Sequence, residues 1–237
     1  MPVTTIDLQS LYRLLHKHFD DRHWWPGETP FEVVTGAVLV QNTAWANVQK
    51  AINNLKRVKA LDPHVLINFP PPKIEELIRP CGYFRVKTVR LMSVTKWWLD
   101  NCDDDIQRFE GSSTAELRTA LLEINGVGAE TADSILLYAI GRPVFVIDAY
   151  TRRIMTRLGY TPDDITYNDL QAFFQKRLTP ELALYNDFHA QFVALGHNHC
   201  RPTPDCTDCP LNFLCQYARS LNQDEPSSLE LGEPSDE

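Results

Sequence analysis

The 237-residue sequence has no apolar run long enough to cross a membrane. Its longest candidate, residues 33–40, spans eight residues and contains Thr35 and Gly36, whereas a spanning helix needs about 20 apolar residues. The N-terminal segment MPVTTIDLQS also lacks the basic and apolar regions of an export signal. We therefore expect a cytoplasmic protein without a membrane partner, associated with the nucleoid if the source is prokaryotic. We expect it to be a monomer.

The sequence also lacks an excess of positive charge, because 23 Lys and Arg oppose 31 Asp and Glu, giving a formal net charge of −8. Nucleic-acid binding requires a basic face. Six of the acidic residues lie in residues 220–237, which contain no Lys or Arg and are rich in Ser and Pro. This segment is predicted to be a disordered tail. The rest of the chain carries 25 acidic and 23 basic residues, a net charge of −2, which does not exclude DNA.

Strand alternation is nearly absent, and only the short run Val144–Ile147 suggests a strand. Apolar residues recur instead at intervals of three and four, for example from Leu8 to Phe19. This is the spacing of one helix face, and prolines and glycines separate the segments. The sequence therefore predicts an all-α protein of about ten helices. The predicted helices include 31–40, 73–79, 85–100, 149–158 and 169–178.

Cysteines are concentrated near the C-terminus, in the pattern C-x5-C-x2-C-x5-C formed by Cys200, Cys206, Cys209 and Cys215. In a reducing compartment such a group is better explained by metal ligation or free thiols than by disulfides. Structural zinc sites usually pair two close knuckles across a longer spacer. Four compactly spaced thiolates instead provide one ligand for each iron of a cubic [4Fe–4S] cluster. We therefore predict an iron–sulfur cluster, with zinc as the alternative.

A glycine-containing turn lies between two predicted helices in the segment LRTALLEINGVGAETADSILLYAI, residues 117–140. The first helix runs to Ile124, the turn is Asn125–Gly128, and the second helix starts at Ala129. Glycines let a ligand approach the main chain, and the amides at a helix start form a site for a phosphate. An ordinary helix–helix turn has the same composition, so spacing alone leaves both readings open. A Rossmann site is disfavoured because no strand precedes the glycines.

Asp148 stands where the apolar segment Val146–Ile147 passes into an amphipathic helix. Aspartate is a preferred helix N-cap, which explains the residue without a function. Alternatively, a carboxylate at the mouth of a cleft could stabilise a cation or activate water. The arginines that follow, Arg152, Arg153 and Arg157, suit either phosphate contacts or a solvated helix face.

Together and in this order, the hairpin, Asp148 and the four cysteines resemble the endonuclease III branch of the helix-hairpin-helix (HhH-GPD) DNA glycosylases. The resemblance covers about residues 6–217 and is most specific in LLEINGVGAETAD and VFVIDAYTRRIMTRLG. The segment PFEVVTGAVLVQNTAW matches the first long helix of the family's barrel domain and the glutamine that follows it. The resemblance implies base-excision repair of double-stranded DNA. The enzyme would flip out a damaged base and hydrolyse its N-glycosidic bond.

The resemblance also implies two all-α domains with a DNA-binding cleft between them. A six-helix barrel containing the helix-hairpin-helix would comprise residues 26–141. A discontinuous iron–sulfur cluster domain would comprise residues 1–25 and 142–219, with 220–237 as the tail.

The resemblance further assigns a role to each matching position. Asp148 would be the catalytic carboxylate. Gln41 and Tyr83 would fill the gap left by the flipped base. The amides that would hold a DNA phosphate belong to Gly126, Val127 and Gly128.

Three positions depart from the strand-nicking members of the family. Glu130 occupies the place of the lysine whose amine attacks the sugar, and a carboxylate cannot form that Schiff base. The first cysteine spacing is C-x5-C instead of C-x6-C, which shortens the loop and puts its phosphate contact in doubt. Tyr150 replaces a histidine two residues after the aspartate. We therefore predict a monofunctional glycosylase with weak or absent AP lyase activity, in which Asp148 assists water.

The tryptophans indicate the lesion. Trp24, Trp25 and Trp45, with their neighbours, resemble the 3-methyladenine DNA glycosylase III type, in which aromatic side chains meet the flipped base. An N-alkylated purine is cationic, so stacking on indole is favoured by roughly 0.5–2 kcal/mol per contact. Trp45 with Trp24 or Trp25 would enclose the base, and Glu130 would orient the purine or the water. Tryptophans are also common core residues, which is the competing explanation.

Two other functions remain open from the sequence. A glycosylase of the endonuclease III type could act on mismatched thymine or uracil or on oxidised pyrimidines, with AP lyase activity. A non-catalytic DNA-binding protein could use the same hairpin. The histidines at 16, 18, 189, 197 and 199 are predicted to be ordinary surface or core residues.

Overall fold

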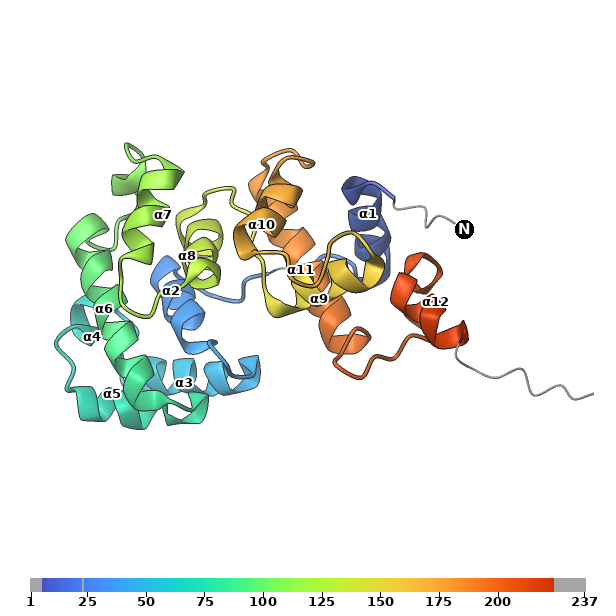
Figure 1. Ribbon diagram of the computed structural model, residues 1–237. Coiled ribbons are helices and arrows are strands. Elements are labelled where there is room, and N and C mark those ends of the chain that lie inside the picture. Colours follow the sequence, from blue (N-terminus) through green and yellow to red (C-terminus); the bar gives the residue numbers. More distant parts are fainter. Residues whose placement is uncertain (1–5, 23, 224–237) are drawn as a thin grey trace, which may run out of the picture.

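The computed structural model describes residues 6–22 and 24–223, and in these residues the protein is all-α without a β-strand. The helices form two groups along an elongated molecule (Figure 1). No helix in the described ranges is both long and apolar enough to span a bilayer. The predicted all-α class is therefore confirmed.

The first group contains the helices between residues 30 and 140. They are α2 (Pro30–Leu39), α3 (Trp45–Arg57), α4 (Pro63–Leu66), α5 (Pro71–Leu77), α6 (Phe84–Cys102), α7 (Thr114–Leu122) and α8 (Ala129–Ser134), with the short turns η1 (Arg79–Cys81) and η2 (Ile106–Phe109). α8 continues as η3 (Ile135–Ile140), a stretch of π-helix. Helix α2 is buried nearly all round because α3, α6, α8 and η3 all pack against it.

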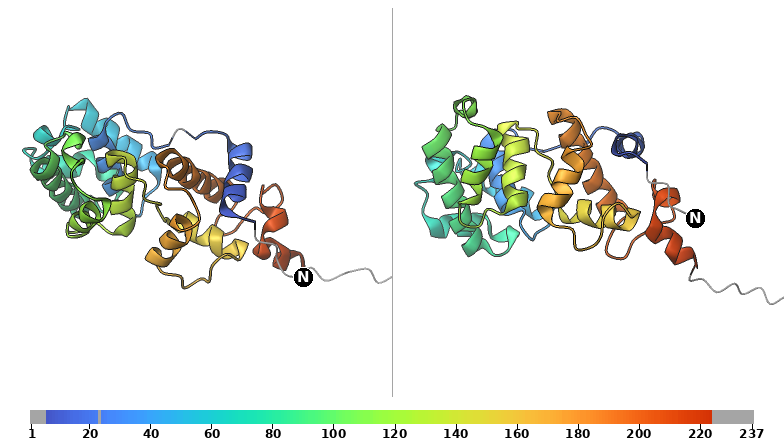
Figure 2. Two further views of the ribbon diagram at one scale, coloured as in Figure 1. Left: turned by 90° about the horizontal axis from the view of Figure 1, so that it is seen from above. Right: turned by 45° about the horizontal axis from the view of Figure 1, so that its top comes forward.

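The second group contains both ends of the described chain. Its helices are α1 (Leu8–Phe19), α9 (Ala149–Leu158), α10 (Tyr167–Gln175), α11 (Leu182–Asn198), η4 (Asn212–Leu214) and α12 (Gln216–Gln223). α11 packs against both α9 and α1, which brings the N-terminal helix beside the C-terminal ones (Figure 2).

Two separate clusters of buried apolar side chains lie inside these groups. One extends through the chain from Phe31 to Val144. The other combines residues of α1 with Leu137 and with residues from Phe145 to Leu211. We infer that they are the cores of the two predicted domains, with the chain crossing between them at about residue 144.

The observed elements differ from the predicted ones in two places. Residues 144–147 form no regular secondary structure and pair with no strand in the described chain. Side chains of α10 supply the hydrogen-bond acceptors that a neighbouring strand would offer. Gln175 accepts from the Phe145 N–H, and the Tyr167 hydroxyl accepts from the Ile147 N–H. Helix α12 continues to Gln223, past the predicted start of the tail at 220. The remaining tail, 224–237, lies outside the described residues.

A buried carboxylate joins the two groups. Asp133 of α8 is fully buried and accepts two hydrogen bonds from Arg118 of α7, at 2.7 and 3.1 Å. Tyr167 and Gln171 of α10 donate to the same carboxylate at 2.9 and 2.7 Å. A buried charge is tolerated only when it is paired and hydrogen-bonded. These four donors therefore fix α10 against the hairpin helices α7 and α8.

Candidate active site

The predicted hairpin is present between α7 and α8. The Val127 N–H donates to the Ile124 carbonyl at 3.0 Å and closes the turn, so this amide is engaged within the protein. The N–H groups of Gly126 and Gly128 have no hydrogen-bond partner among the residues described. A Cβ at Gly128 would meet no atom within 4 Å, so a ligand can reach the main chain at the start of α8.

Two side chains outside the hairpin, Gln41 after α2 and Arg90 on α6, hold the hairpin turn in place. Gln41 donates through Nε2 to the Gly126 carbonyl and the Thr131 hydroxyl, both at 3.0 Å. Arg90 donates to Gln41 Oε1 and lies where a Cβ on Gly126 would be. Gly126 also has a φ of 87°, a conformation that favours glycine. Gln41 therefore anchors the turn of the hairpin through its side-chain amide.

Tyr83 is the other residue that was predicted to fill the gap left by the flipped base. It occupies the N-cap position of α6, and its side chain is 74% exposed. This large aromatic side chain is therefore mostly exposed, unlike the hydrogen-bonded amide of Gln41.

Asp148 is both a helix cap and a member of a polar cluster. Its Oδ1 accepts from the Thr151 N–H at 2.7 Å, and its Oδ2 lies 3.6 Å from Nε2 of His189. That separation is a close polar contact, although it is too long for a strong hydrogen bond. Burial disfavours the charged form of Asp148, but His189 and the Thr151 N–H outweigh it and lower the carboxyl pKa below its usual value. Asp148 is therefore held ionised at neutral pH.

His189 was predicted to be an ordinary histidine, and its position beside Asp148 was missed. It lies on α11, only 4% exposed, with Nδ1 2.6 Å from the hydroxyl of Tyr138 on η3. Burial and the charge of Asp148 raise the pKa of Tyr138 well above its ordinary value. The helical spacing of His189 and Phe192 on α11 indicates that His189 is buried, but the sequence does not indicate which groups it meets.

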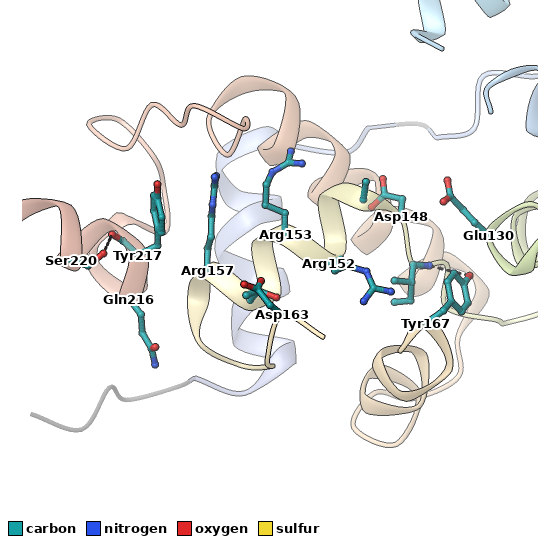
Figure 3. A pocket seen from close by; sticks show the side chains of 13 residues that line it. Glu130, Asp148, Arg152, Arg153, Arg157, Asp163, Tyr167, Gln216, Tyr217 and Ser220 are labelled. Carbon is teal, nitrogen blue, oxygen red and sulfur yellow. Dashed lines mark hydrogen bonds between the residues drawn. The ribbon is translucent and has the colours of Figure 1, made fainter. Parts of the chain in front are cut away.

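Glu130, the second residue of α8, lines the same groove as Asp148. The two carboxyl groups lie at one end of this groove (Figure 3). The residue is solvent-exposed at the groove. The surrounding protein still desolvates the carboxyl, and this raises its pKa to about 7. The charge of Asp148 adds to the increase, whereas His189 opposes it.

The groove has a volume of about 870 Å³ and follows α9 toward α12. Three arginines of α9 line it (Figure 3). Arg153 donates to the Cys200 carbonyl and Arg157 to the Arg201 carbonyl, at 2.8 and 2.7 Å. Arg152 donates to the carbonyl of Ile165. Because each guanidinium has five N–H donors, donors remain for phosphate oxygens.

The three predicted pocket tryptophans, Trp24, Trp25 and Trp45, lie together, and we refer to them as the tryptophan cluster. Their ring centroids are 5.1 to 6.1 Å apart, at interplanar angles of 50 to 89°. They therefore pack on one another and leave no slot between parallel rings. Gly36 allows this packing, since a Cβ there would lie 3.3 Å from Trp25. None of the three lines the groove.

Tyr138 connects the tryptophan cluster to Asp148. Its ring centroid is 5.2 Å from that of Trp25, and its hydroxyl contacts His189. A continuous path of contacts therefore runs from Trp25 through Tyr138 and His189 to Asp148.

The four predicted cysteine ligands line one pocket beside α9 and α12. Burial, with neighbouring cysteine sulfurs adding, raises the thiol pKa of Cys206 and Cys215, and raises that of Cys209 to about 11. Arg157 donates to the Cys200 sulfur at 3.3 Å. In the described chain, no group of three or more His, Cys, Asp or Glu side chains is already arranged to hold a metal ion. Cys81 and Cys102 are buried in the first group, as ordinary core thiols.

Comparisons with known proteins agree on one family. Residues 35–180 match the HhH-GPD superfamily of base excision DNA repair proteins. A Methanocaldococcus jannaschii protein provisionally named a DNA repair glycosylase is 42% identical over 209 residues, covering 88% of this chain and 95% of that protein. Endonuclease III of Thermotoga maritima is 28% identical over 220 residues, covering 92% and 96%.

A solved structure agrees with these sequence relatives. The Helicobacter pylori 3-methyladenine DNA glycosylase, bound to 1,N6-ethenoadenine, is 28% identical and has a TM-score of 0.71, covering 81% of this chain and 98% of that one. The chain therefore belongs to the HhH-GPD superfamily of base excision DNA repair proteins, in its endonuclease III-like glycosylase branch.

Proposed function

We propose that this protein is a monofunctional DNA glycosylase that removes N-alkylated purines, such as 3-methyladenine, from double-stranded DNA. The observation that carries the proposal is the contact path from the tryptophan cluster to Asp148. Glu130 stands at that site instead of an amine, which supports hydrolysis over Schiff-base chemistry.

The tryptophan cluster suits a cationic base. Alkylation at a ring nitrogen makes a purine positively charged, and indole faces attract cations by roughly 0.5–2 kcal/mol each. The rings of Trp24 and Trp45 contact each other at 6.1 Å, so a base enters between them only if one ring moves. Stacking on the outer face of the cluster requires no such movement.

Asp148 supports the bond-breaking step. An alkylated purine is already a good leaving group, so the site must chiefly stabilise the positive character of the sugar. Water oxygen bonds to the sugar carbon, the electron pair of the glycosidic bond leaves with the base, and Asp148 accepts the proton from water. Glu130, beside it, would orient the purine or the water.

The hairpin supports DNA binding. The amides of Gly126 and Gly128 would bind a phosphate at the start of α8. Val127 would shape the turn without donating, because its N–H is already used. Tyr83, exposed at the start of α6, would enter the space of the flipped base, and Gln41 would act there through its hold on the hairpin.

We further infer that Cys200, Cys206, Cys209 and Cys215 hold a [4Fe–4S] cluster. The donor chemistry fits, because four thiols line one pocket. Burial first, and then the neighbouring sulfurs, raise the pKa of Cys206, Cys209 and Cys215, an effect that cationic iron would reverse. When bound, the cluster supplies four iron–thiolate bonds that close the loop between α11 and α12. Iron and sulfide in the purified protein, with an absorbance shoulder in the blue region, support this cofactor. A colourless protein with stoichiometric zinc would replace it by the alternative.

A panel of defined lesions tests the activity. Duplexes containing 3-methyladenine, mismatched thymine or uracil, or an oxidised pyrimidine are incubated with excess enzyme, and the released base is identified. We expect release of 3-methyladenine by the wild type. Release of a pyrimidine alone would overturn the assigned substrate, and release of no base would overturn the glycosylase.

Asp148→Asn is the matched inactive variant. Asparagine is also a good N-cap, so α9 should remain stable while excision falls by at least about 100-fold. DNA binding should persist. Asp163→Asn is the control, because Asp163 lines the same groove and should retain wild-type activity.

A further inference from the structure

The buried imidazole of His189 has an unusual setting. Its side chain is 5% exposed, and Nε2 has no conventional hydrogen-bond partner among the residues described. The group it faces is the Asp148 carboxylate, 3.6 Å away. A buried polar atom without a partner destabilises the folded protein, so its retention beside Asp148 requires an explanation.

Asp148 and Tyr138 together select the ring nitrogen of His189 that carries the proton. The Tyr138 hydroxyl is the partner of Nδ1 at 2.6 Å, and the tyrosine is neutral. A neutral tyrosine that donates to Nδ1 leaves the imidazole proton on Nε2, which faces Asp148. With the opposite tautomer, a bare Nε2 lone pair would face the carboxylate and repel it.

We propose that Tyr138 and His189 are positioning residues for Asp148. The Tyr138 hydroxyl fixes the His189 tautomer, and the Nε2–H of His189 holds Oδ2 of Asp148 ionised and turned toward the sugar. The inference rests on the proposed function, since it explains how that function's carboxylate is prepared.

The arrangement also links recognition to chemistry. The Tyr138 ring contacts Trp25 at 5.2 Å, and Trp25 contacts Trp45 at 5.1 Å. A base that displaced Trp25 would therefore press on the Tyr138 ring, whose hydroxyl contacts His189.

Other charged or titratable groups around the pair come from three helices. Glu130 of α8 lies near both Asp148 and His189. Arg152 and Arg153 of α9 line the same groove, as does Tyr167 of α10. The charges of Glu130 and Asp148 disfavour each other, so the pH dependence is compared with Glu130 kept unchanged in every variant.

The test uses single-turnover excision of 3-methyladenine from duplex DNA by the full-length protein across pH. In Tyr138→Phe the ring stays on Trp25 but the tautomer is no longer fixed, so burial raises the pKa of Asp148. The acid limb of the rate profile should therefore move to higher pH by about one unit, a tenfold loss at the acid end. Tyr160→Phe is the control, because it removes a half-buried hydroxyl that donates at 2.6 Å to the Ile6 carbonyl, in a contact that does not involve Asp148.

Two substitutions of His189 separate its contacts. His189→Gln can still reach toward Asp148 with an N–H and should keep most of the wild-type profile. His189→Asn can keep the Tyr138 contact but not the Asp148 contact, and it should show the acid-limb shift. Melting temperature and DNA affinity are measured for each variant.

The outcomes are distinguishable. An equal rate loss at every pH, or a loss that follows only the melting temperature, would show that the pair merely packs the core and would overturn the inference. A wild type that releases no base, or an Asp148→Asn variant as active as the wild type, would instead overturn the proposed function.

Discussion

The carboxyl group of Glu130 illustrates what one side chain contributes at the residue scale. Its pKa is raised to about 7 because the surrounding protein desolvates the carboxyl and because the charge of Asp148 lies nearby. The folded state therefore binds its proton more tightly than the unfolded chain, and the associated stability is lost as pH rises through 7. Glu130→Gln should match the wild type in melting temperature near pH 4.5 and exceed it at pH 8. Glu123→Gln, an exposed change on the same hairpin, is the control, and a parallel rise in that variant would contradict the assignment.

A second residue-scale prediction concerns strand nicking. No lysine amine is available at position 130, so borohydride should not trap a covalent complex between this protein and damaged DNA. An endonuclease III assayed in parallel is the positive control. Efficient trapping would show that another amine reaches the sugar, and the monofunctional assignment would then be wrong.

At the scale of elements, the two hairpin glycines should separate folding from binding. Gly126→Ala places a Cβ against Arg90 at a φ of 87°, so it should cost roughly 1–3 kcal/mol of stability. Gly128→Ala has open space and an ordinary φ of −92°, so it should fold normally. Both should weaken binding to duplex DNA, as measured by titration. Undiminished affinity in Gly128→Ala would contradict a phosphate at this turn.

The elements also show what the sequence could predict. Helix α9 begins after Asp148 and ends at Leu158, as its spacing predicts, because a cap and an apolar stripe are local signals. The segment before it was misread as a strand because its partners, Tyr167 and Gln175, are supplied by a later helix. His189 was missed for the same reason. Its meaning depends on Tyr138, 51 residues away, and no local pattern encodes that contact.

At the scale of the whole molecule, Asp133 connects the two groups of helices to the candidate active site. Asp133 and Glu130 both belong to α8. Tyr167 donates to Asp133 and accepts from the N–H of Ile147, the residue before Asp148. Through Tyr167, the same carboxylate therefore links the helix that carries Glu130 to the residue before Asp148.

This connection predicts unequal effects of three substitutions. Asp133→Ala leaves Arg118 partly buried without its partner and should cost about 3–5 kcal/mol. Arg118→Ala leaves the fully buried Asp133 without its charged partner, so the double variant should be more stable than the sum of the single losses predicts.

Tyr167→Phe removes one neutral donor and should cost about 0.5–1.5 kcal/mol. Because it also frees the Ile147 N–H, it should slow excision more than its small stability loss explains. Denaturant unfolding and single-turnover rates measure the two effects. A rate unchanged in Tyr167→Phe would mean that α9 alone positions Asp148, since its cap bond to Thr151 would then suffice.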